Sequence, residues 1–113
     1  MHAECSIGDL VASPTQFLYL WTFTTIDVVS AEDCEARWDY LREMLPRYVR
    51  TFHVTESHPK GHGHHVHAVT DVRLDLAIVR PQAGKAGFGR VNVKPVPKAN
   101  ASSLISYLKK DGN

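Results

Sequence analysis

The sequence predicts an α+β domain of the ferredoxin-like, split βαβ type, in which helices flank a central antiparallel sheet of about four to five strands. Three observations lead to this prediction. The chain has 113 residues, of which 43% are hydrophobic, so residues 1–113 are expected to form a single domain around one core. Segments with the two-residue period of strands alternate with segments that have the period of helices. The resulting order is strand, helix, strand, strand, helix, strand, helix.

The first strand and the first helix are expected in the N-terminal half of the chain. Residues 16–26, with the sequence QFLYLWTFTTI, are rich in β-branched and aromatic residues and lack Gly and Pro, which is typical of a central buried strand. Ser30 and Asp33 have the spacing of a capping box, and apolar residues recur after them at helical spacing. We expect Pro46 to end this helix.

The second half of the chain supplies the remaining elements. Residues 49–58 and 64–73 have strand character on either side of the turn-rich segment PKGHG, and they are expected to form a hairpin. Residues 74–80 are expected to form a short helix, followed by a flexible connection, QAGKAGFG. The segment RVNVKPV alternates as a strand, and Pro95 indicates that this strand ends or lies at a sheet edge. Asn100 is the expected N-cap of a last helix, ASSLISYLKK.

Composition narrows the class of protein. No apolar run approaches the roughly 18 residues of a membrane span, and the N-terminus does not resemble a signal peptide, so we expect a soluble, cytoplasmic protein. Two cysteines, Cys5 and Cys34, are too few for a disulfide framework. Residues 1–45 contain two Lys or Arg against eight Asp or Glu, whereas residues 46–113 contain eleven against four. The basic part suits a polyanionic partner, and an ordinary solvated surface explains it equally well.

His65 and His67 form a His-x-His pair on a predicted strand. Alternate residues of a strand project to one face, so both imidazoles point the same way, roughly 6.6 Å apart along the chain. If the hairpin turns symmetrically about Lys60 and Gly61, Glu56 lies directly opposite His65 on the same face, with β-carbons about 5 Å apart. Two imidazoles and one carboxylate would then converge on one metal ion.

Other interpretations of this histidine-rich segment stay open. His58, His62 and His64 compete as ligands, although His64 is expected to face the opposite side and the other two lie at the turn. Isolated histidines are also often plain surface or core residues. The donor set itself leaves several chemistries open, because hydrolytic zinc sites and non-haem iron sites use two histidines and a carboxylate too.

A nucleophile elsewhere in the chain would narrow these chemistries, and the last predicted helix offers Tyr107. Lys110 follows three residues later and therefore shares a helix face with it. A phenol has a pKa of about 10 and attacks only with help from a nearby cation or metal, which Lys110 could provide. A tyrosine next to Leu104 and Leu108 is, however, more often a residue at the edge of a core.

The combination and order of these motifs resembles the HUH endonuclease family, specifically the replication initiators of bacteriophages and related rolling-circle replicons. The resemblance rests on WTFTT in the first strand, on HVH preceded by a glutamate, on GFGRVNVKPV, and on YLKK in the last helix, and it spans about residues 17–112. A second tyrosine one helical turn on, which some phage members have, is replaced here by Asp111, so the chain resembles the single-tyrosine type.

The resemblance implies a metal-dependent enzyme that nicks and joins single-stranded DNA and so initiates rolling-circle replication. His65, His67 and Glu56 would hold Mg²⁺ or Mn²⁺. Tyr107 would form a covalent 5′-phosphotyrosine, assisted by Lys110. The implied partners are single-stranded origin DNA, often presented as a hairpin, and a helicase domain or host helicase, with no membrane. The chain stops just after the catalytic helix, so a domain excised from a longer protein is expected.

Contacts to DNA are expected from basic residues and from stacking along the sheet. Two alternatives are kept: a transposase or relaxase of the same chemistry, and a non-catalytic nucleic-acid-binding module on a similar sheet. Such modules expose aromatic residues on their central strands, where this chain has histidines and a glutamate. The candidate DNA-binding residues are Arg50, Lys60, Arg90, Lys94 and Lys98.

Overall fold

The computed structural model describes residues 4–57 and 64–111, with side chains described as far as Leu108 in the last helix. Its elements follow the predicted order, with one short helix added at the N-terminal end. They are α1 (Ile7–Val11), β1 (Phe17–Thr25), α2 (Ala31–Met44), β2 (Thr51–Ser57), β3 (His64–Thr70), α3 (Leu76–Ala86), β4 (Phe88–Pro97), the 3₁₀ turn η1 (Lys98–Asn100) and α4 (Ala101–Asp111).

The four strands form one sheet in the order β2-β3-β1-β4, and every neighbouring pair is antiparallel. Strand β3 therefore lies between β1 and β2, and β1 lies between β3 and β4. This arrangement confirms the predicted α+β, split βαβ fold. Strand β4 is at an edge, as Pro95 indicated, because an edge strand needs no backbone donor on its outer side.

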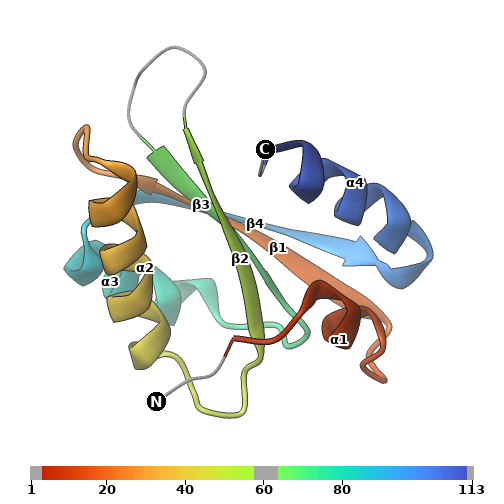
Figure 1. Ribbon diagram of the computed structural model, residues 1–113. Coiled ribbons are helices and arrows are strands. Elements are labelled where there is room, and N and C mark those ends of the chain that lie inside the picture. The colour runs from red at the N-terminus through yellow and green to blue at the C-terminus, as the bar shows by residue number, and fades with distance from the viewer. Residues whose placement is uncertain (1–3, 58–63, 112–113) are drawn as a thin grey trace.

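Helices cover both faces of the sheet. Figure 1 shows α2 and α3 on one face and α1 and α4 on the other. Under α2 and α3 lies an aromatic core that includes Trp21, Phe23 and Trp38. Under α1 and α4 lies an aliphatic core that includes Leu18 and Leu104. Alternate residues of β1 thus enter different cores, which explains why the strand is continuously apolar or aromatic from Phe17 to Trp21.

Two elements differ from the expectation. Helix α1 was not expected; Ser6 and Asp9 form a full capping box there, and Leu10 is fully buried. The expected flexible connection QAGKAGFG is wrong, because α3 continues through Pro81 to Ala86 and β4 begins at Phe88. Burial of the apolar face of α3 outweighs the low helix propensity of Pro and Gly, and Gly87, at φ 99°, then ends the helix.

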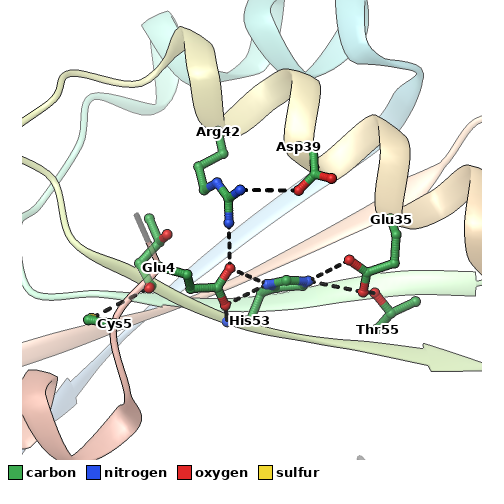
Figure 2. A network of polar contacts seen from close by, with 8 residues as sticks. Glu4, Cys5, Glu35, Asp39, Arg42, His53 and Thr55 are labelled. Atoms are coloured by element: carbon green, nitrogen blue, oxygen red, sulfur yellow. Dashed lines mark hydrogen bonds and ion pairs between the residues drawn. The ribbon is translucent and has the colours of Figure 1, made fainter. Parts of the chain in front are cut away.

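A polar network joins the N-terminal segment, β2 and α2 (Figure 2). The His53 ring lies between two carboxylates, with Nδ1 2.6 Å from Glu4 Oε2 and Nε2 2.9 Å from Glu35 Oε2. Arg42 donates to Glu4, and Thr55 donates to Glu35. Burial alone would lower the pKa of His53, but its contacts with the two carboxylates outweigh burial and raise that pKa. Through these contacts the His53 ring links the N-terminal segment, β2 and α2.

Cys5 and Cys34 are free thiols, and burial raises the pKa of Cys34 to about 11, which makes that thiol a poor nucleophile. Among the residues that the structure describes, no helix has both the length and the apolar character needed to cross a membrane.

Candidate active site

The β2–β3 pairing brings a carboxylate and two imidazoles together on one face of the sheet. Glu56 lies directly opposite His65, as the symmetric hairpin predicted, although the turn itself is outside the described residues. Glu56 Oε1 is 3.0 Å from His65 Nε2, and Glu56 Oε2 is 3.3 Å from His67 Nε2. One donor atom from each of the three residues lies within 4.8 Å of the other two. The single carboxylate thus bridges both rings.

The surroundings fix the orientation of this cluster. The His67 side chain is only 5% exposed, and its ring meets that of His65 edge to face, with centroids 4.7 Å apart. Thr22, which is opposite His67 on β1, places Oγ1 3.2 Å from His67 Nδ1. When Nδ1–H donates to this hydroxyl, Nε2 keeps its lone pair and can act as a metal ligand.

The donor set fits a divalent cation. Two imidazole nitrogens and one carboxylate are ligands that Mn²⁺, Fe²⁺ and Zn²⁺ accept, and three protein ligands leave positions open for a substrate. The close approach of Glu56 to both rings is what convergence on one ion requires. Glu56, His65 and His67 are thus three residues that could hold one divalent cation.

Among the side chains of α4 that the structure describes, that of Tyr107 contacts this cluster. Its ring lies 5.5 Å from the His67 ring at an interplanar angle of 73°, and the residue is 44% exposed. Leu104 and Leu108 of the same helix are buried in the aliphatic core and hold α4 against the sheet. The Tyr107 side chain is therefore accessible to solvent, and the helix that carries it is held against the sheet. Lys110 follows in α4, but its side chain is outside the described residues.

The structure brings only some of the candidate DNA-binding residues to this face. Arg90 and Lys94 of β4 are exposed and lie opposite Thr24 and Leu20, on the same face as the histidines. Arg50 precedes β2, at the end of the strand away from Glu56, and pairs with Asp71 at 2.9 Å.

The other candidates lie elsewhere. Lys98 is in η1 beyond the far end of β4, where its Nζ is 3.4 Å from Ser13 Oγ. His64 faces away from the cluster, as expected, with Nδ1 2.8 Å from the carbonyl of Val29. Lys60, His58 and His62 are outside the described residues.

Thr22 is the site residue that sequence reasoning missed. The alternation of WTFTT assigns Thr22 to the same face as Leu18 and Leu20, which was a usable signal. Its contact with His67 depends on the register between β1 and β3, which are separated along the chain by a helix and another strand.

Comparisons with protein-family models, with curated proteins and with solved structures find no match. What this site does must therefore be inferred from its own residues. They are two imidazoles, of which that of His67 is buried and that of His65 partly buried, a carboxylate close to both, a partly exposed phenol beside them, and two exposed cations on the same face.

Proposed function

We propose that this chain is a metal-dependent endonuclease that cuts single-stranded DNA and becomes attached to it through Tyr107, as the nicking domain of a rolling-circle replication initiator of the HUH family does. The observation that carries the proposal is the position of the Tyr107 ring, 5.5 Å from that of His67. A phenol can form a covalent ester, and a neighbouring cation site supplies the activation that such an attack needs.

In the proposed reaction, Glu56, His65 and His67 would hold Mg²⁺ or Mn²⁺. When bound, such a cation supplies Lewis-acid polarisation of the scissile phosphate. Tyr107 Oη attacks phosphorus, and its new bond forms as the bond from phosphorus to the 3′-oxygen breaks. The phenol proton ends on the leaving 3′-oxygen, which becomes a hydroxyl. The 5′-phosphotyrosine conserves the ester, so a 3′-hydroxyl can reverse the reaction and join strands without ATP.

The remaining features of this face support a nucleic-acid substrate. Arg90 and Lys94 are exposed cations on the sheet face that carries the cluster, and they suit the phosphates of a single strand. Lys110, one turn after Tyr107, is proposed to favour the phenolate through its positive charge. Single-stranded origin DNA presented as a hairpin, and a helicase in cis or in trans, remain the proposed partners.

Tyr107→Phe tests the proposal, because it removes one oxygen and keeps the ring that contacts His67. The substrate is a pool of oligonucleotides with a long randomised segment, incubated with Mn²⁺. Wild type should give a protein band that resists denaturant and carries DNA, with the adduct mapped by mass spectrometry to the peptide containing Tyr107. The Phe variant should bind Mn²⁺ and DNA yet give no adduct and no cut strand.

Tyr40→Phe and Tyr48→Phe are matched controls, because both tyrosines are exposed, at 57% and 69%, and neither belongs to α4. Both should form the adduct like wild type. An adduct that persists in Tyr107→Phe would contradict the assignment of the nucleophile. Cut DNA without any adduct would instead identify activated water and a metal-dependent hydrolase.

A further inference from the structure

A groove of about 450 Å³ lies between the edge strand β4 and the segment formed by η1 and α4. Leu20, Val96 and Leu104 give it an apolar lining, and they belong to the aliphatic core. A larger hollow of about 780 Å³ lies beside α3 and is lined by residues such as Tyr19 and Arg73. That hollow is not lined by Glu56, His65, His67 or Tyr107, whereas the groove is lined by Tyr107.

Tyr107 belongs both to the groove and to the surroundings of the cluster formed by Glu56, His65 and His67. This tyrosine lines one end of the groove, and its ring also contacts the ring of His67. Along β1, Leu20 of the groove is two residues from Thr22, which contacts His67. Two residues of a strand span roughly 6.6 Å, a displacement on the scale of one nucleotide. A strand whose phosphate is at Tyr107 would therefore place a neighbouring nucleotide in the groove.

The polar side chains of the groove suit a nucleotide. Lys94, Asn100 and Ser103 line it and are exposed, and among the side chains that the structure describes, in residues 4–57 and 64–108, they have no hydrogen-bond or ion-pair partner. An amide and a hydroxyl together offer donors and acceptors that can pair with a base edge. An ammonium group suits a phosphate. The apolar lining can take the face of a base, and the volume is within the usual range of small-molecule sites.

We propose that this groove binds the nucleotide next to the scissile phosphate, and that Asn100 and Ser103 read its base. The inference rests on the proposed function, because Tyr107 defines the scissile phosphate. It assigns Asn100 and Ser103 as determinants of sequence preference at one position beside the cut, and Lys94 as a contact to the backbone that carries no sequence information.

The test compares the sequence profiles of DNA captured covalently from a randomised pool. The variants are Asn100→Ala with Ser103→Ala, and Asn100→Asp, which keeps the shape of the side chain and removes its two donors. Base contacts of this kind are each worth about 1–3 kcal/mol of discrimination, so preference at one position beside the cut should fall about tenfold or more. All other positions should keep their profile. Asn100→Asp should change the preferred base rather than abolish preference.

Two controls separate base reading from folding and from general affinity. Ser102→Ala, an exposed change in the same helix and outside the groove, should leave the whole profile unchanged. Lys94→Gln should weaken binding to every sequence alike and lower the salt slope by about 0.7, without a change in profile. Thermal unfolding of each variant should match that of wild type.

Binding selection with Tyr107→Phe, which cannot cut, gives a readout independent of cleavage. If Asn100→Ala with Ser103→Ala also lowers the base preference at that position in the Tyr107→Phe background, the groove proposal is supported. If wild type forms an adduct and the profile of the double variant equals that of wild type, the groove proposal is overturned and the proposed function stands. If wild type forms no adduct with Tyr107, the proposed function fails, and this inference fails with it.

Discussion

Thr22→Val should weaken metal binding although Thr22 is not itself a ligand. The change keeps the β-branched shape that suits a strand and removes the hydroxyl 3.2 Å from His67 Nδ1. Without that acceptor, Nδ1–H is buried beside a methyl group. The alternative tautomer places the proton on Nε2, 3.3 Å from Glu56 Oε2, where it blocks the lone pair that a metal needs.

The size of the effect follows from the type of contact. Partners of metal-bound histidines are typically worth 10- to 100-fold in metal affinity, and carboxylate partners give the strongest support. A neutral hydroxyl at 3.2 Å is a weaker partner, so we expect a loss of about tenfold, or about 1.4 kcal/mol. Calorimetric titration with Mn²⁺ measures it directly, and thermal unfolding shows whether the fold survives.

Thr24→Val is the matched control, because Thr24 is on the same face of the same strand, opposite His65. It should bind Mn²⁺ like wild type, and Thr22→Ser should restore affinity because serine keeps the hydroxyl. If Thr22→Val and Thr24→Val bind Mn²⁺ equally well, the hydroxyl does not orient His67 and the reasoning is refuted.

Three further predictions concern the cluster, the substrate and the fold. His65→Ala or His67→Ala should sharply lower Mn²⁺ affinity by calorimetry, and unchanged affinity in the double variant would place the metal elsewhere. Affinity for single-stranded DNA should fall steeply with salt, and Arg90→Gln should reduce the slope of log K against log salt by about 0.7. Arg50→Gln should leave that slope unchanged, because the Arg50 guanidinium already pairs with Asp71. An affinity that does not change with salt would contradict phosphate contacts. Folding raises the pKa of His53, so the contribution of this residue to stability is fully present below its unfolded pKa of about 6.5 and is lost as pH rises through its higher folded pKa. Urea unfolding at a series of pH values should show this loss for wild type and not for His53→Gln.

The contact between Glu56 and His65 could be predicted because it is local. The assumption of a symmetric hairpin fixes one register, and that register is the one observed between residues 51–57 and 64–70. The contact between Thr22 and His67 is a different case. It depends on how β1 pairs with β3, a long-range choice that periodicity within either strand does not encode.

The error in α3 has a related cause. Pro81 and Gly84 are locally unfavourable in a helix, and a reading of propensity ends the helix near them. Val79, Ala83 and Ala86 nevertheless recur on one face and are buried in the aromatic core. Burial of that face against the strands and α2 therefore extends the helix past Pro81 and Gly84, and these contacts cannot be read from the local sequence.

The composition of β1 shows where the core of this face ends and the site begins. On the face toward α4, the strand presents Leu18 and Leu20, which pack with the aliphatic core, and then Thr22 beside His67. On the opposite face of β3, Val66 is fully buried in the aromatic core next to the two histidines. Burial of Val66 fixes the backbone that carries both imidazoles, so the cluster rests on a rigid strand rather than on a loop. Such support is what a metal centre needs to hold its ligands in place before the ion arrives.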